Sequence, residues 1–305
     1  MITLLRACGK MPQMALCFAL ATAGCGSSGA NSGGDLGAGD AGGDFAAGVD
    51  LAGAACPLGA DTTPSSTVTN GCARLVRDTS ACNAARAAQG LTGAWLEFSC
   101  RVTLTHVTGA ASYVQASSDS RPDYASNYFT TGDACWVAYT PAFPDPNTIT
   151  VQSLSIKAPD APDTAGAAMG LGPVGIAVNG VAIFDNQAAP GDDIFTEASS
   201  FDRCGGHPAP GGEYHYHGEP YAISYDDANL IGVLRDGYFV YGRRDAGGSL
   251  PTGLDAHGGH VAATPDSATP VYHYHLTQQT STSSGTLGQM QWFLTTGTYE
   301  GTPLP

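Results

Sequence analysis

The sequence Tyr-His-Tyr-His at residues 214–217 occurs a second time at residues 272–275. Each copy follows the pattern Asp-x-x-Gly-Gly-His, which stands at 202–207 and at 255–260. Tyrosine favours strands, and successive side chains of a strand point to opposite faces of its sheet. We therefore predict two strands that each present two histidines on one face and two tyrosines on the other. Of the eight histidines, only His106 lies outside this duplicated part of the chain.

Two imidazoles at positions i and i+2 of a strand are close enough to bind one metal ion. The glycine pair of each copy would let the backbone turn sharply and bring a third histidine to them. The simplest geometry places the two strands side by side or across a narrow cleft, with all the imidazoles in one shared site. The predicted metal-site residues are His207, His215, His217, His260, His273, His275, Asp202 and Asp255.

Two roles are open for the aspartates, as metal ligands or as hydrogen-bond partners of the far nitrogen of a ligating histidine. His257 is a further candidate ligand, and Glu213 is a candidate general base for a metal-bound water. Both also fit an ordinary solvated side chain. Imidazole ligands outside the cytoplasm favour zinc or copper, and the sequence does not choose between them. In the alternative interpretation, the imidazoles only join strands through hydrogen bonds.

Both copies belong to longer stretches, namely GPVGIAVNGVAIFDN (172–186), DRCGGHPAPGGEYHYHGEP (202–220), LIGVLRDGYFVYGRRD (230–245) and LDAHGGHVAATPDSATPVYHYHLT (254–277). These stretches resemble the YHYH domain family of secreted and surface-attached bacterial proteins. The similarity covers about residues 130–280. Because no activity is established for that family, the resemblance implies a domain and not a reaction.

The chain departs from the YHYH family at one position. A cysteine often stands in the family where this chain has His257. If that cysteine pairs with the counterpart of Cys204, the resemblance implies that the disulfide pairing differs in this chain.

The N-terminal residues 1–24 are typical of a bacterial lipoprotein signal peptide. A basic start is followed by an apolar run, Met14 to Ala21, that is too short to span a bilayer. The run ends at Thr22-Ala23-Gly24-Cys25, so we expect cleavage to leave a lipidated Cys25. Gly26 follows it in place of an aspartate, which favours the outer membrane. The alternative is an ordinary secretory signal cut nearby.

A tether of Gly, Ala, Ser and Asp follows at residues 25–54. Such a segment buries too little apolar surface to offset its conformational entropy. The formal net charge of −15 argues against a nucleic-acid partner, which requires a basic face. We therefore expect contact with a membrane through the lipid anchor only, and a small molecule or a metal as the ligand.

The chain has nine cysteines, of which Cys8 and Cys17 would leave with the signal and Cys25 would carry lipid. An even number remains, and in an exported chain this predicts three disulfides with connectivity that the sequence does not show. These cysteines are Cys56, Cys72, Cys82, Cys100, Cys135 and Cys204.

The rest of the chain predicts a mostly β fold, a sandwich or barrel-like domain with an irregular, disulfide-stapled N-terminal part. We expect a Cys-rich N-terminal β part at 55–130 and the YHYH domain at 131–305. Asn179-Gly180 and Asp236-Gly237 each lie between apolar runs and predict hairpins. A short helix is expected at 81–89, and strands are expected within 94–107, 134–140, 148–156, 174–184, 230–242 and 289–299.

Three functions are compatible with this pattern. The first is a surface-anchored lipoprotein whose task is to bind zinc or copper. The second is a metal-dependent enzyme, a hydrolase or a copper oxidase, that uses the same histidines. The third is a structural or adhesive module without metal. A closed shell of ligands favours binding, and an open coordination position favours an enzyme.

Overall fold

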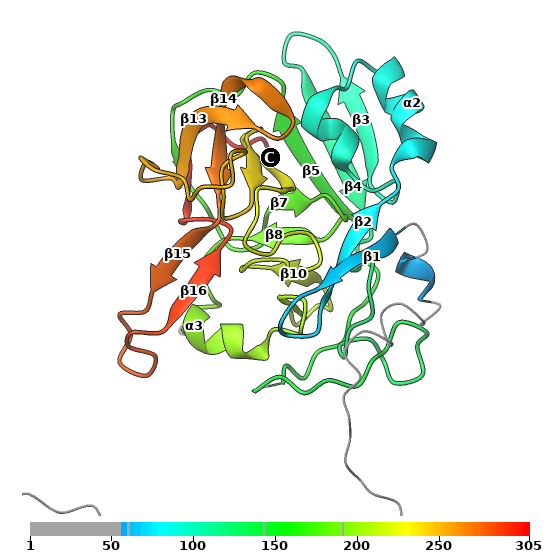
Figure 1. Cartoon of the computed structure of the whole chain (residues 1–305), viewed down its shortest axis with the longest axis vertical. Helices are drawn as coiled ribbons and strands as arrows, with labels where there is room; N and C mark the ends of the chain where they lie inside the picture. Colours follow the sequence, from blue (N-terminus) through cyan, green and yellow to red (C-terminus); the bar gives the residue numbers. More distant parts are fainter. Residues whose placement is uncertain (1–55, 60–61, 143, 191) are drawn as a thin grey trace, which may run out of the picture. The chain divides into compact units, whose positions relative to one another are not determined.

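The computed structural model describes residues 56–59, 62–142, 144–190 and 192–305 (Figure 1). The predicted signal peptide, the lipidated Cys25 and the tether lie outside these residues. The described part is mostly β, as predicted. Within it, no helix has the length and apolar character needed to cross a membrane.

The largest sheet has eight strands and contains both YHYH copies. Its two ends are different strands, so the sheet is open. In chain order the strands are β7 (Pro173–Ala177), β8 (Ala182–Phe184), β9 (Gly206–Pro208), β10 (Tyr214–Tyr216), β11 (Leu230–Leu234), β12 (Phe239–Tyr241), β13 (Gly259–Thr264) and β14 (Ser267–His275). Across the sheet the order is β13-β14-β12-β11-β7-β8-β10-β9.

This order consists of two equivalent halves. Hairpins β7-β8 and β11-β12 form at the predicted Asn-Gly and Asp-Gly turns, so these predictions are confirmed. In each half a YHYH strand joins the hairpin in parallel, β10 beside β8 and β14 beside β12, and the Gly-Gly-His strand pairs antiparallel with it. We call residues 173–217 the first repeat and residues 230–275 the second repeat.

An approximate two-fold axis relates the repeats at the centre of the sheet. There β7 pairs antiparallel with β11, and Ile176 lies opposite Val233. Gly175 and Gly232 occupy equivalent positions on either side of this pair. A Cβ atom at either glycine would overlap the carbonyl oxygen of the strand opposite, Val233 O or Ile176 O. The close approach of the two repeats therefore requires glycine at both positions.

Smaller elements surround this sheet. Strand β5 of a three-stranded sheet packs against β7 and β11, and one core runs from Cys56 to Tyr299, so the boundary predicted at 130 and 131 does not separate two cores. The helices are η1 (Pro57–Gly59), α2 (Ser80–Ala88), η2 (Gly93–Glu97), α3 (Ile194–Glu197) and η3 (Ala198–Ser200). The remaining strands are β1 (Thr62–Thr67) with β2 (Ala73–Arg77), β3 (Thr103–Val107) with β4 (Tyr113–Ser118) and β5 (Leu154–Pro159), β6 (Ala167–Ala168) with β17 (Thr298–Tyr299), and β15 (Thr277–Thr280) with β16 (Met290–Phe293).

Some of the predicted strands are wrong in part or entirely. In the segment 148–156 only residues 154–156 belong to a strand, β5. The segment 94–107 begins as η2, and only its end forms β3. The segment 134–140 forms no strand, although it alternates, because its backbone closes a turn instead. The amide of Trp136 donates to the carbonyl of Asp133, and the Asp133 carboxylate accepts from the amide of Cys135. Aspartate favours such local turns over a strand ladder.

All six described cysteines are paired, so the prediction of three disulfides is confirmed. The pairs are Cys56–Cys135, Cys72–Cys204 and Cys82–Cys100. Cys204, which lies inside the first Asp-x-x-Gly-Gly-His pattern, is therefore joined to the residue before β2. This bond fixes the loop that leads into the first repeat's histidine.

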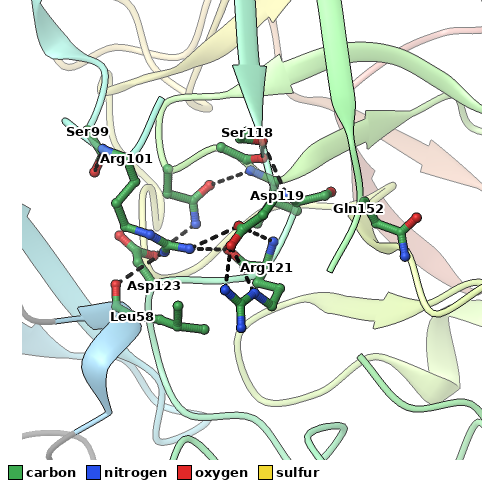
Figure 2. Close-up of polar contacts among 12 residues, drawn as sticks. Leu58, Ser99, Arg101, Ser118, Asp119, Arg121, Asp123 and Gln152 are labelled. Carbon is green, nitrogen blue, oxygen red and sulfur yellow. Dashed lines mark hydrogen bonds and ion pairs between the residues drawn. The ribbon is translucent and has the colours of Figure 1, made fainter. Parts of the chain in front are cut away.

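The turn after β4 is held by two arginines (Figure 2). Arg101 and Arg121 both donate to the carboxylate of Asp119, and Arg101 also donates to the carbonyl of Leu58. The network joins η1 to residues 119–126. That segment then lies along the tyrosine face of the first repeat, where it supplies buried polar partners described below.

Candidate metal centres

Six of the predicted ligands form two groups, one in each repeat. The first group is His207, His215 and His217 with the carboxylate of Glu197 from α3. The second group is His260, His273 and His275 with the carboxylate of Asp245. Within each group the four ligand atoms lie within 4.8 Å of one another.

The strand register explains both groups. His207 of β9 is directly opposite His215 of β10, and His260 of β13 is directly opposite His273 of β14. The second histidine of each YHYH copy lies two residues further along on the same face. A cross-strand neighbour and an i+2 neighbour therefore bring three imidazoles together.

The interpretation that all six imidazoles share one site is wrong. In the described sheet, strands β8, β7, β11 and β12 stand between β10 and β14. The two YHYH strands are thus not neighbours, and their histidines belong to two separate groups. Each repeat instead completes a group of its own, because the Gly-Gly-His strand that pairs with each YHYH strand comes from the same repeat.

The interpretation of Asp202 and Asp255 as ligands, or as partners of ligating histidines, is also wrong. Their carboxylates lie on the tyrosine face, where Tyr214 donates to Asp202 at 2.7 Å and Tyr272 donates to Asp255 at 2.9 Å. The other oxygen of each accepts the amide of the second glycine. The physical reason is the alternation of the strand, which separates the aspartates from the imidazoles by the thickness of the sheet.

The glycine pair makes room for this contact. Gly205 and Gly258 have φ angles of +96° and +82°, which favour glycine. At the next position, a Cβ on Gly206 would overlap the ring of Tyr214, and a Cβ on Gly259 would overlap the hydroxyl of Tyr272. The pattern Asp-x-x-Gly-Gly-His therefore seats the first tyrosine of each YHYH copy as well as placing its histidine.

The second tyrosine of each copy is held by the hairpin turn of its own repeat. Asn179 donates its side-chain amide to the hydroxyl of Tyr216, and Tyr274 donates to the carboxylate of Asp236. Asn179 and Asp236 thus bind these tyrosines as well as forming the hairpin turns. Tyr124, from the segment after β4, bonds to the hydroxyls of both tyrosines of the first copy.

Backbone carbonyls set the orientation of the four strand imidazoles. The Nδ1 atom of His215 lies 2.9 Å from the carbonyl of Glu213, and that of His273 lies 2.9 Å from the carbonyl of Val271. His217 and His275 use the carbonyls that follow β8 and β12, those of Asp185 and Gly242. A carbonyl only accepts, so each Nδ1 carries the proton and each Nε2 carries a lone pair.

The two lone pairs of each YHYH copy face each other. The Nε2 atoms of His215 and His217 are 3.0 Å apart, as are those of His273 and His275. Two acceptors at this distance repel unless a proton or a cation lies beside both. Two nitrogens bound about 2.0–2.1 Å from one ion would be ~2.8–3.4 Å apart at bond angles of roughly 90–110°. The observed spacing fits a shared metal ion.

Further ligand atoms in both groups have no hydrogen-bond partner among the described residues. They include Nε2 of His207, Nε2 of His260 and Oδ1 of Asp245. The carboxylate oxygens approach without hydrogen-bond geometry, at 3.4 Å from Glu197 to His207 and at 3.1 Å from Asp245 to His260. Buried polar atoms are normally paired, and a bound cation would satisfy these atoms.

A family model described as YHYH protein matches residues 155–249. The predicted resemblance is confirmed. The matched YHYH segment runs from β5 to beyond β12, so it contains the whole first group and Asp245 of the second, but not the second YHYH copy. No curated protein and no solved structure matches the chain.

Burial keeps the imidazoles of the YHYH segment neutral. Loss of solvent lowers the pKa of His207 to about 3 and that of His217 to about 4, and it lowers the pKa of His273 in the second repeat to about 4. Burial, with repulsion from Asp192 and Asp145, raises the pKa of Glu197 to about 7. Near pH 7 these three imidazoles are therefore already free of the proton that would compete with a metal ion.

The other two candidates lie outside both groups. The ring of His257 contacts the hydroxyl of Thr298 at 2.8 Å, and Glu213 contributes its carbonyl to His215, while its side chain lines a separate pocket with Arg235. Conversely, sequence reasoning missed Glu197 and Asp245. Neither stands in a repeated pattern, and Glu197 comes from a helix between β8 and β9, so no signal in the YHYH segment's sequence pointed to them.

Proposed function

We propose that the protein binds two transition-metal ions, zinc or copper, one in each histidine–carboxylate group. The observation that carries the proposal is the pair of Nε2 atoms 3.0 Å apart, which recurs in both repeats with the Nδ1 protons directed to carbonyls. Each group offers three nitrogens and one oxygen, which suits tetrahedral zinc and also copper.

We further propose that the metal sites are displayed at the cell surface on a lipoprotein. The lipoprotein signal pattern and Cys25 in the sequence support this placement. The three disulfides support it as well, since such bonds persist in oxidising compartments outside the cytoplasm. The tether would then keep the anchor clear of the folded part.

A metal-dependent enzyme is the second candidate, and the second group favours it. The side chains of His260 and Asp245 are 13% and 24% exposed, so solvent reaches this group from one side. An ion there could exchange a ligand for water, which is what a hydrolase or a copper oxidase needs. A structural or adhesive module without metal fits less well, because it leaves the facing lone pairs unexplained.

Elemental analysis tests the proposal directly. The mature protein, loaded with Zn²⁺ or Cu²⁺ and then desalted, should hold two ions per chain. His217→Gln and His275→Gln should each hold one, and the double variant none. His257→Gln and Glu213→Gln are matched controls that should keep both ions, since these side chains lie outside the groups. Failure of the unmodified protein to retain either metal would exclude metal binding as its function.

A further inference from the structure

A pocket of ≈ 400 Å³ lies between the loop after β4 and the segment that leads to β5. Its walls are residues 127–131, 136, 139–140 and 144–148. None of these residues is a predicted ligand or belongs to either metal group, but the carboxylate of Asp145 lies 3.7 Å from Nδ1 of His207. The volume is within the range of small-molecule sites and would accommodate one or two sugar rings.

Aromatic side chains form one part of its wall. Trp136 and Tyr139 are each 38% exposed, and they are the only aromatic residues among the exposed large hydrophobic side chains of the described chain. Both line this pocket, together with the ring of Tyr128. Exposed aromatic rings that gather in one place indicate a binding surface, because burying them elsewhere would be favourable.

Polar groups form the other part. Asn127, Asp145 and Asn147 line the pocket, along with several threonines. The side-chain oxygen of Asn127 is buried and has no hydrogen-bond partner among the described residues. Of the described lining residues, none is Lys, Arg or His. The pocket therefore offers amides, hydroxyls and one carboxylate to a ligand. The guanidinium of Arg203 lies 5.4 Å from the centroid of the Tyr139 ring and donates to the carbonyl of Ala138, so this neighbouring cation is already engaged.

The aromatic wall is held in place before any ligand arrives. The disulfide Cys56–Cys135 immediately precedes Trp136, and Trp136 forms a β-bridge with Ser126. Tyr128 accepts a hydrogen bond from the amide of Asp145, which joins the two walls. A fixed wall reduces the entropy that ligand binding would otherwise cost.

We propose that this pocket binds a neutral saccharide of one or two rings. The apolar C–H faces of a sugar pack against Trp136 and Tyr139, while its hydroxyls bond to Asn127, Asp145 and Asn147. Flat aromatic groups, planar amides and the Asp145 carboxylate line the pocket, and Arg203 is already stacked on Tyr139. This combination favours a neutral sugar over a phosphate or an acidic ligand. The proposal does not depend on the metal groups.

Binding can be measured with the metal-loaded mature protein by titration calorimetry and tryptophan fluorescence. The probes are cellobiose, maltose and N,N′-diacetylchitobiose, with pull-down on insoluble cellulose, chitin and peptidoglycan. At least one probe should bind saturably. Trp136→Ala and Asn127→Ala should each weaken that binding about tenfold, as expected for loss of ~1.4 kcal/mol. Trp136→Phe retains a ring and should keep most of the affinity.

Leu171→Ala is the matched control, because Leu171 is 61% exposed and lies outside the pocket. It should bind as the unmodified protein does. The metal content of every variant reports separately on folding and on the metal groups. Absence of binding to all six probes overturns the proposal, and so does a probe that binds Trp136→Ala and Asn127→Ala with unchanged affinity.

Discussion

The first and second metal groups share a scaffold but differ in their surroundings. In the first group the ring of Phe184 stacks on His215 at 3.9 Å, and Phe201 packs against His207 and His217. In the second group Tyr241 contacts His273, and no aromatic ring of the described residues besides the group's own imidazoles contacts the half-buried His260. The two groups thus differ at the imidazole of the Gly-Gly-His strand, which is 2% exposed in His207 and 13% exposed in His260, while the carboxylates of Glu197 and Asp245 are exposed to a similar extent.

The carboxylates differ as well, and this difference is the more instructive one. The carbonyls of Asp185 and Gly242, which orient His217 and His275, follow β8 and β12 at equivalent positions. Asp245 comes three residues after Gly242, whereas Glu197 comes from α3, so the two carboxylates occupy non-equivalent positions. The duplicated strands fix the positions of three imidazoles in each group. The carboxylate beside them and the exposure of each group to solvent differ between the repeats.

The largest effect is expected when one candidate ligand of the first group is removed. His217→Gln should release the first ion and destabilise the metal-loaded protein by about 4 kcal/mol at a free metal concentration of ~1,000 Kd. That corresponds to a fall in Tm of roughly 10 °C by calorimetry. His275→Gln should cost less, because water can reach the remaining ligands of the second group. Equal falls in Tm for His217→Gln and His275→Gln would show that the two groups do not differ in this respect.

Alanine substitutions in the two glycine pairs test the same difference between the repeats, with a smaller expected effect on stability. Gly206→Ala forces a methyl group against the ring of Tyr214, which is fully buried, and should cost ~2–3 kcal/mol. Gly259→Ala meets the hydroxyl of Tyr272, which is only partly buried and can shift, and also the backbone carbonyl oxygen of His273, so we expect about 1–2 kcal/mol. Urea unfolding of both metal-free variants measures the difference. A larger cost at Gly259 would contradict it.

Acid should destabilise the metal-free protein through its buried histidines. The pKa of His217 is about 4 in the folded protein, below its ordinary value near 6.5. The unfolded chain therefore binds more protons below pH 6.5, and folding stability falls as the pH drops from there toward 4. At pH 5 this histidine should account for about 2 kcal/mol.

Urea unfolding of the metal-free protein at pH 7.5 and pH 5 measures this dependence, which should be shallower in His217→Gln. His273→Gln should give a similar reduction, because burial lowers the pKa of His273 to about 4 as well. His106→Gln should act in the opposite direction. The bonds of His106 to Gln89 and Asp160 raise its pKa, so its contribution is present at low pH and is lost as the pH rises. An unchanged slope in His217→Gln would show that the imidazole is protonated in the folded state.

The smallest expected effect is on the rate of metal release and not on stability. When the loaded protein is mixed with a coloured chelator, the ion of the second group should leave first, since the side chain of His260 is 13% exposed whereas that of His207 is 2% exposed. Release should follow two phases, and His275→Gln should lack the fast one. A single phase in the unmodified protein would mean that both groups exchange equally well.

The sequence by itself determined the local features of this protein. The alternation of Tyr and His predicts strands with two chemically different faces, and Asn179-Gly180 and Asp236-Gly237 predict hairpins, because both depend on neighbouring residues only. The even number of cysteines predicted three disulfides because cysteines of an exported chain are normally paired, but it did not show which ones pair. The spacing of six histidines also singled out the imidazoles that the two groups bring together.

Only the tertiary structure decided how these parts combine. The Gly-Gly-His strand of each repeat pairs within its own repeat, so there are two groups and not one. Side-chain alternation and the glycine pair turned Asp202 and Asp255 toward the tyrosines. Glu197 and Asp245 reached the imidazoles from segments without any shared pattern. Such contacts join residues distant in the chain, and they depend on strand order and register, which local sequence does not encode.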